Sequence, residues 1–300
     1  YPYDVKLDTM GNIYIADTNN YRIRKVDATT GMISTIVGKG LAGNSDNLPG
    51  TSCAIGEIRY LVISTNGILY LSDYSYSRIK RLDNGVLYGT AGNSTTGFWG
   101  DGGPATSAML KLQHGLYLDT NGILFIADRS NHRIRRIAVN GIISTVAGNG
   151  RSGIYSGDGG SATSASLNFP TNVWGDSLGN LYITDERNGK LRFVSAINSI
   201  ITTLAGIGAT GVSGFSGDGG PATSALLSSC YGIFGDSSGQ IYFGDGGNAR
   251  VRRISNSGII TTLIGTGITT FNGDMTFANK TNIGSINGIW VNTNGDVYFT

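Results

Sequence analysis

The hydrophobic positions of this chain fall into short segments that polar turns separate. One set of four occupies residues 115–118, 123–126, 133–137 and 142–146. Segments of this length, rich in β-branched and aromatic residues and bounded by Gly, Asn, Asp and Ser, predict β-strands. The first two segments do not alternate strictly between apolar and polar residues, which is typical of strands covered on both faces. No stretch has a helical period with caps, so we expect an all-β fold.

The set of four segments recurs about every 57 residues. Glycines that close the turn between the first and second segments mark the copies, and they stand at positions 11, 67, 122, 179, 239 and 295. Self-similarity at such a period indicates a repeat architecture, and four strands repeated radially form a β-propeller blade. The predicted blades span about residues 1–38, 58–92, 114–148, 171–206 and 231–265, and a partial blade spans 287–300.

An acidic and a basic residue recur around the turn between the second and third strands. A catalytic group is needed once, whereas a turn has to be rebuilt in every blade. We therefore interpret the pair as structural, an Asp-capped hairpin with a basic side chain that pairs with or lies over its neighbour. The acidic residues are Asp17, Asp73, Asp128, Asp185 and Asp245, and the basic residues are Arg22, Arg78, Arg133, Lys190 and Arg250.

Residues 11–26, Gly-Asn-Ile-Tyr-Ile-Ala-Asp-Thr-Asn-Asn-Tyr-Arg-Ile-Arg-Lys-Val, resemble an NHL repeat. The connector Gly-Asp-Gly-Gly-Pro-Ala-Thr-Ser-Ala at 100–108, with copies at 157–165 and 217–225, is similar to connectors of extracellular and bacterial NHL proteins. The likeness covers essentially the whole chain. It implies a six-bladed β-propeller with four antiparallel strands per blade.

The strand count implies that the sixth blade is incomplete. Five blades of four strands and two further strands make 22, two short of the 24 of a six-bladed propeller. We expect the chain to be an excerpt of a longer protein in which residues upstream of Tyr1 supply the missing strands, because an open blade exposes strand edges. The alternative is that such edges join copies head to tail into a filament.

Composition narrows the possible partners. Charged residues make up 14% of the chain and the net charge is +2, so no chain-wide basic field attracts nucleic acid. RNA binding, which occurs in some NHL proteins, therefore stays a lesser alternative despite the basic third strands. No run of about 18 apolar residues is present, so no membrane-inserted segment is expected.

The resemblance also raises a second function class, metal-dependent hydrolases and lyases with a propeller fold. Some hold zinc through several histidines, but this chain has two, His114 and His132, and a catalytic zinc usually takes three protein ligands. We expect both histidines on one face of blade three and treat them as binding candidates. Calcium takes about six to eight oxygens, and each connector offers a single carboxylate, from Asp101, Asp158 or Asp218. We therefore predict no metal, no cofactor and no catalytic residue.

The remaining candidates lie in the connectors. Aromatic residues stand three positions before the connector Asp, at Phe98, Tyr155 and Phe215, and Trp99 follows the first. They are either anchors between blades or platforms for a protein or glycan partner. The glycosylation sequons at Asn93 and Asn279 favour an extracellular or cell-surface glycoprotein. The leading hypothesis is a non-enzymatic interaction or structural module that binds other proteins or copies of itself, in an appendage or filament.

Overall fold

The computed structural model describes residues 2–153, 155–207, 213–292 and 294–300, and Tyr1 of the first predicted blade lies outside them. The chain divides into two compact units, which are described separately below. Unit 1 comprises Tyr1–Asn131 and Arg135–Thr145, and unit 2 comprises His132–Ile134 and Val146–Thr300. We call the sheets with four consecutive strands blades 1 to 5, in chain order.

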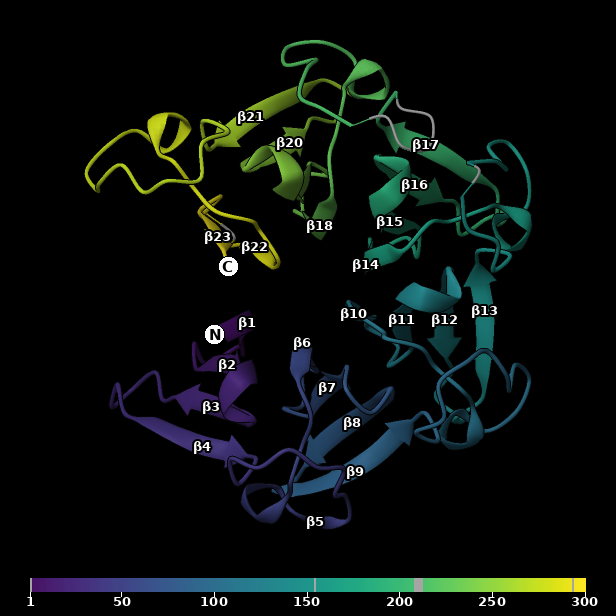
Figure 1. Cartoon of the computed structure of the whole chain (residues 1–300), viewed down its shortest axis with the longest axis vertical. Helices are drawn as coiled ribbons and strands as arrows, with labels where there is room; N and C mark the ends of the chain where they lie inside the picture. Colours follow the sequence, from purple (N-terminus) through teal and green to yellow (C-terminus); the bar gives the residue numbers. More distant parts are fainter. Residues whose placement is uncertain (1, 154, 208–212, 293) are drawn as a thin grey trace. The chain divides into compact units, whose positions relative to one another are not determined.

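Unit 1 contains blades 1 and 2 and most of blade 3, and the strands of each blade lie side by side in chain order (Figure 1). Blade 1 consists of β1 (Pro2–Leu7), β2 (Ile13–Asp17), β3 (Arg22–Val26) and β4 (Ile33–Val37). Blade 2 consists of β6 (Ile58–Ile63), β7 (Leu69–Asp73), β8 (Arg78–Asp83) and β9 (Val86–Ala91), and the short β5 (Leu48–Pro49) pairs with β9. Blade 3 consists of β10 (Leu116–Leu118), β11 (Leu124–Asp128), β12 (Arg133–Ile137) and β13 (Ile143–Ala147).

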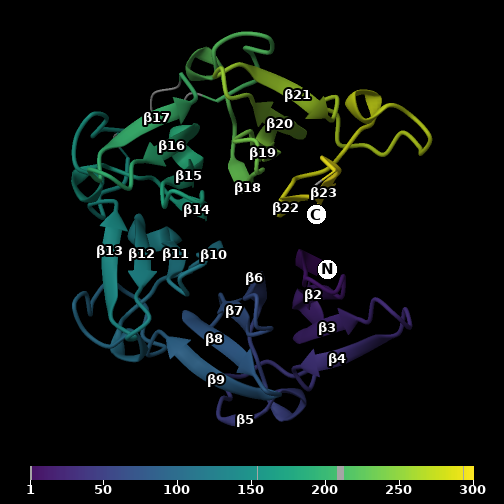
Figure 2. The same ribbon diagram turned by 180° about the vertical axis from the view of Figure 1, so that it is seen from behind.

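Unit 2 contains two further blades and a two-stranded sheet, which Figure 2 shows from the opposite side. Blade 4 consists of β14 (Pro170–Gly175), β15 (Leu181–Asp185), β16 (Lys190–Val194) and β17 (Ile201–Ala205). Blade 5 consists of β18 (Cys230–Gly235), β19 (Ile241–Asp245), β20 (Arg250–Ile254) and β21 (Ile260–Ile264). The last sheet pairs β22 (Ile289–Val291) with β23 (Val297–Phe299).

The fold is therefore an all-β propeller, as the sequence predicted, with a different blade count. Among the described residues there are five four-stranded blades, not six, and β22 and β23 form a sheet of two. In blades 1, 2, 4 and 5 neighbouring strands are antiparallel, and the second and third strands pair without a register shift, as Leu181–Val194 and Asp185–Lys190 do in blade 4.

Single-turn 3-10 helices shape the hairpins and connectors. Those in the hairpins are η1 (Thr18–Asn20), η4 (Arg129–Asn131), η6 (Glu186–Asn188) and η8 (Gly246–Asn248). The residue after each turn is left-handed, and this is where His132 stands, with φ of 55°. The connector helices are η2 (Gly50–Ser52), η3 (Ala105–Ser107), η5 (Ala162–Ser164), η7 (Ala222–Ser224) and η9 (Ala278–Lys280).

Each Gly-Asp-Gly connector binds the outer strand of the blade that follows it. In blade 3 the amide of Gly102 donates to the carbonyl of Ile143, and the amide of Ile143 donates to the carbonyl of Gly103. The connector alanines Ala105 and Ala108 are buried in the same apolar cluster as Ile143. Because the connector is pinned at both its backbone and its apolar side, its aspartate is presented to the blade in a fixed position.

Candidate functional site

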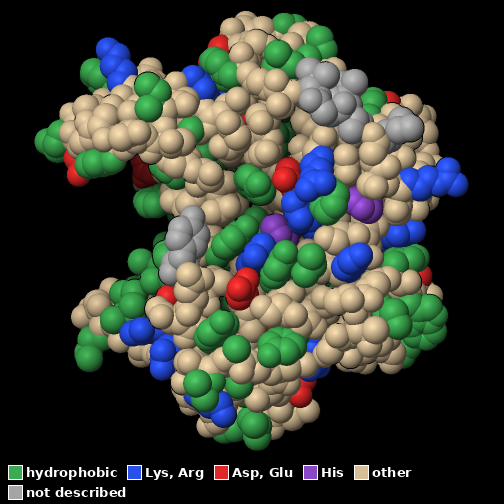
Figure 3. Space-filling view, viewed as in Figure 1, with side chains coloured by type: hydrophobic (Ala, Val, Ile, Leu, Met, Phe, Trp, Pro, Cys, Tyr) green, Lys and Arg blue, Asp and Glu red, His purple; other side chains and the backbone are tan. Residues whose placement is uncertain are grey.

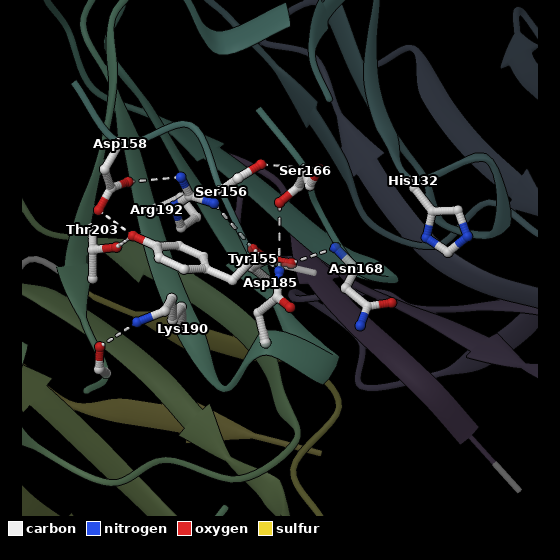
Figure 4. A network of polar contacts seen from close by, with 12 residues as sticks. His132, Tyr155, Ser156, Asp158, Ser166, Asn168, Asp185, Lys190, Arg192 and Thr203 are labelled. Atoms are coloured by element: carbon white, nitrogen blue, oxygen red, sulfur yellow. Dashed lines mark hydrogen bonds and ion pairs between the residues drawn. The ribbon is translucent and has the colours of Figure 1, made fainter. Parts of the chain in front are cut away.

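A buried arginine joins two carboxylates in blade 4, as Figure 4 shows. Nη2 of Arg192 lies 2.7 Å from Oδ1 of the connector residue Asp158, and Nη1 lies 3.3 Å from Oδ2 of Asp185 at the end of β15. Asp185 also accepts hydrogen bonds from the Asn168 amide and the Asn188 side chain. We call this arrangement of one arginine and two aspartates the clamp, because it links a connector to the blade that follows it in the chain.

The clamp recurs in blades 3 and 5. Arg135 bonds Asp101 and Asp128, with the shorter contact at 2.6 Å, and Arg252 bonds Asp218 and Asp245, with the shorter contact at 2.8 Å. All three arginine side chains are fully buried. Their partners include the connector aspartates that a calcium site would have required. In the described part of the chain, no group of three or more His, Cys, Asp or Glu residues could hold a metal ion.

The basic residues that the sequence singled out stand two positions before the clamp arginines, and they bond other groups. Arg133 donates to the carbonyl of Asn149 and lies against Gly150, where an added Cβ would come within 2.1 Å of its guanidinium. Lys190 likewise donates to the carbonyl of Gly206. Sequence reasoning missed Arg135, Arg192 and Arg252, although the Arg-x-Arg spacing places both basic side chains on one face of the strand.

The other marked residues of the repeat make the same kinds of local contact. In blade 1, Asp17 accepts a hydrogen bond from Asn20 and Arg22 donates to the carbonyl of Lys39. In blade 2, Asp73 pairs with the buried Lys80. In the same blade Arg78 pairs with Asp46 at 2.6 Å, and in blade 5 Arg250 donates to the carbonyl of Thr266.

The connector aromatics lie against clamp arginines. The ring centroids of Phe98, Tyr155 and Phe215 lie 4.8, 4.9 and 4.8 Å from the guanidinium carbons of Arg135, Arg192 and Arg252. The contact orients each ring, but Phe98 and Phe215 are 41% and 40% exposed, so the anchoring role and the platform role both stay predictions. Trp99, whose side chain is 61% exposed, remains available on the surface.

A second set of polar residues, which does not repeat, gathers in unit 1. The guanidinium of Arg59 on β6 lies over the ring of Tyr74, 3.4 Å from its centroid, and 5.3 Å from the centroid of Tyr3. Its Nη1 lies 3.3 Å from Nε2 of His114, and its Nη2 lies 3.3 Å from a carboxylate oxygen of Glu57. We call Arg59, His114, Tyr3, Tyr74 and Glu57 the Arg59 cluster.

His114 is neutral in this cluster. Burial lowers its pKa well below the ordinary histidine value, and the nearby cations Arg129 and Arg59 lower it further. Because a guanidinium can only donate, Nε2 of His114 accepts from Arg59 and the ring proton lies on Nδ1. This Nδ1 is buried and has no hydrogen-bond partner among the described residues. A buried donor without a partner costs about 1–3 kcal/mol, so His114 is held in this place at a cost in stability.

The cluster arises from one position of the repeat. Tyr3, Arg59 and His114 all stand eight residues before the hairpin glycine of their blades. The repeat therefore puts a different polar or aromatic side chain at one place in each of three adjacent blades, on β1, on β6 and just before β10. Arg59 was absent from the sequence-based candidates, and the signal that could have found it is this lack of repetition.

The two histidines have different partners in the structure. His114 packs against Tyr3, Tyr60 and Tyr74. His132 packs edge-on against Phe169, and its Nδ1 accepts a hydrogen bond from the Phe169 amide. His132 thus belongs to the packing of a turn, whereas His114 belongs to the Arg59 cluster.

The two sequon asparagines differ in how they are bonded. Asn93 is exposed, but its side chain donates to the carbonyl of Ser107 and accepts from the amide of Thr95. Asn149 makes the equivalent pair of bonds at the start of the next connector. Asn279 lies in η9, is exposed, and has no side-chain hydrogen bond among the described residues.

Two family models match parts of the chain. One is described as a teneurin NHL domain and matches residues 210–287, and the other is described as the NHL repeat and matches residues 114–137. Human (Homo sapiens) NHL repeat-containing protein 2 is 27% identical over 66% of this chain and 31% of that protein. Mouse (Mus musculus) teneurin-4 is 28% identical over 67% of this chain and 8% of that protein. The chain thus spans less than a third of the length of these relatives.

Solved structures share the fold. Virginiamycin B lyase from Staphylococcus aureus matches with a TM-score of 0.60 at 17% identity, over 100% of this chain and 77% of that chain. A chain of a nidogen/laminin complex matches with a TM-score of 0.60 at 15% identity, over 96% of this chain and 84% of that chain. At these identities the likeness shows the propeller architecture alone.

Proposed function

We propose that this chain, which belongs to the NHL-repeat family, is a non-enzymatic interaction module that acts outside the cell or at its surface. The observation that carries the proposal is the division of its polar side chains. The repeated aspartates and clamp arginines are bound to one another inside the blades, while Nδ1 of His114 in the Arg59 cluster has no hydrogen-bond partner in the portion of the chain that the structure describes.

The Arg59 cluster has the composition of a protein-binding hot spot. Arginine and tyrosine are enriched at such sites, where a few residues supply most of the binding free energy. Tyr74 and Tyr3 hold the guanidinium of Arg59 in one orientation, so little side-chain freedom is left to lose on binding. With Arg59 and Arg129 near His114 and Glu57 as the counter-charge, an acidic group of a partner suits the cluster.

The enzyme alternative requires a metal or a catalytic set. The likeness to virginiamycin B lyase concerns the fold, and the connector aspartates that could bind calcium contact arginines in the clamps. Metal analysis of the purified chain tests this part of the proposal. Stoichiometric zinc or calcium, together with turnover of a lactone or cyclic peptide ester, would overturn the non-enzymatic assignment.

RNA binding finds little support on the surface. On the face shown in Figure 3 the Lys and Arg side chains stand among uncharged and acidic side chains. Among the described residues, no helix is both long and apolar enough to cross a membrane. Proteins, with glycans as a second class, are therefore the proposed partners.

Copies of the chain itself are among these partners. Phe271 stands three residues before Asp274, like Phe98 before Asp101, but among the described residues no third-strand arginine lies against it and its side chain is 71% exposed. The adjoining sheet has β22 and β23 alone. A pair of strands carrying an arginine from a second copy would cover both Phe271 and this sheet. Sedimentation of the wild type and of Phe271→Ser tests the self-association.

Binding measurements on the Arg59 cluster test the main proposal. The wild type, Arg59→Ala and the control Arg136→Ala, a half-buried arginine of β12, are compared against a panel of purified ectodomains. We expect a partner that binds the wild type and the control, and that binds Arg59→Ala about thirtyfold more weakly, as for loss of a hot spot. Equal binding by all three proteins would place the interaction elsewhere and refute this role of the cluster.

A further inference from the structure

A cavity of about 500 Å³ lies between residues of blades 2 and 3, within unit 1. Three strands of blade 2 contribute Tyr70, Arg81 and Thr90 to its lining. The opposite side is formed mainly by apolar residues of blade 3, including Leu124, Ile137 and Ile142. An apolar wall with a few polar groups, at this volume, is typical of a site for a small molecule.

Tyr70 departs from the repeat at this place. In blades 1, 4 and 5 the equivalent tyrosines, three residues after the hairpin glycine, donate to an aspartate of the hairpin; these pairs are Tyr14–Asp8, Tyr182–Asp176 and Tyr242–Asp236. Blade 2 has Ser64 at the aspartate position, and its hydroxyl bonds Ile68 instead. The Tyr70 hydroxyl is thus left without the usual acceptor. Burial raises its pKa, so it stays protonated and can donate.

Arg81 supplies a positive charge, and no carboxylate within the described ranges of the chain contacts it directly. It is the Cα partner of Tyr70 across β7 and β8, so both side chains stand on one face of blade 2. Its guanidinium lies 5.0 Å from the ring centroid of Tyr88. Among the described residues it forms neither an ion pair nor a hydrogen bond, in contrast to the clamp arginines.

Thr90 places a hydroxyl where other blades have an apolar side chain. It precedes Ala91, which pairs with Ile79, just as Leu204 precedes Ala205, which pairs with Leu191. The Thr90 hydroxyl is buried and finds no partner in the described part of the chain. An unsatisfied hydroxyl at this depth is unfavourable unless a ligand or water bonds it.

We propose that this cavity binds a small organic carboxylate. The carboxylate pairs with Arg81 and accepts from the hydroxyls of Tyr70 and Thr90, while the apolar part of the ligand packs against Leu124 and Ile137. A carboxylate suits the site because Arg81 provides one positive charge and a planar fork of donors. The cavity is lined by residues of unit 1 outside the Arg59 cluster, so binding of the carboxylate does not depend on the proposed protein partner.

Titration calorimetry of the full chain with benzoate, and with the neutral benzamide, tests the proposal. We expect benzoate to bind the wild type and benzamide to bind at least about tenfold more weakly, because the amide lacks the charge-assisted hydrogen bonds. Arg81→Gln should weaken benzoate binding by a similar factor. The matched control is Arg253→Gln, at the same register opposite Tyr242 in blade 5, and it should bind as the wild type does.

Thr90→Leu tests the site with a variant whose loss of binding would not result from loss of the fold. It introduces the residue found at this position in blade 4, so it should fill the cavity and abolish benzoate binding while the melting temperature is unchanged or raised. Benzoate binding that survives both Arg81→Gln and Thr90→Leu would overturn the assignment of the site. Failure of the wild type to bind benzoate, or equal binding of benzamide, would overturn the assignment of the ligand.

Discussion

Replacement of Arg135 by methionine should destabilise the protein far more than removal of its connector partner. Asp128 and Arg135 are fully buried, whereas Asp101 is about a third exposed. Removing the arginine leaves the Asp128 carboxylate buried with two neutral donors, the Lys111 amide and the Asn131 side chain. Loss of one partner of a buried ion pair costs about 3–5 kcal/mol. Asp101→Asn removes a charge that solvent screens, so we expect the free energy of unfolding to fall by about 1 kcal/mol or less.

Urea unfolding at pH 7 measures both effects, with Arg136→Met as the control on the same strand. The double variant Arg135→Met/Asp128→Asn should be more stable than Arg135→Met alone, because it removes the orphaned charge. Acid should have the same effect as the second substitution, since protonation of Asp128 also removes the charge. If Arg135→Met costs no more than Asp101→Asn, or if neither acid nor the double substitution restores stability, the clamp does not stabilise the blade in this way.

Burial raises the pKa of Asp128 from 3.8 to about 6, so its carboxyl stabilises the native state most below pH 4 and less as the pH rises to 6. The free energy of unfolding of Asp128→Asn, relative to that of the wild type, should therefore rise between pH 4 and 6. A fall of this difference over the same interval would contradict the prediction. Gly150→Ala should lower the melting temperature, because its φ is +82° and the new Cβ meets the Arg133 guanidinium, whereas Gly153→Ala, with open space around it, should lower the melting temperature less. In a secretory host, glycan mapping should find Asn279 occupied more fully than Asn93, and the reverse ratio would show that the side-chain bonds of Asn93 do not protect it.

The strands and the repeat could be predicted because their causes are local. The short apolar runs, the hairpin glycines and the connector motif all lie within one period, and the antiparallel sheets have the strands that these patterns predict. His132 and its repeat equivalents, Tyr21, Ser77, Gly189 and Ala249, share one turn position, and the structure shows that all five are left-handed. The blade count differed, since the described residues form five four-stranded blades and a pair of strands.

The polar contacts of the clamps and of the histidines could not be predicted from local sequence patterns. Sequence reasoning selected Arg133 in place of Arg135, because both are basic and only burial distinguishes the clamp arginine. It proposed His114 and His132 as a pair, whereas each packs with its own aromatic partners.

The amino-acid order by itself determined the strands, their turns and the repetition of one blade, since hydrophobic alternation and glycine conformations act over a few residues. Only the tertiary structure decided which polar side chains pair with one another inside a blade and which do not. Arg59 and His114 are 55 positions apart, and they meet because neighbouring blades pack their first strands together. Burial and charge pairing depend on that packing, so an arginine is fully buried between two aspartates in blade 3 and partly exposed beside aromatic rings in blade 2.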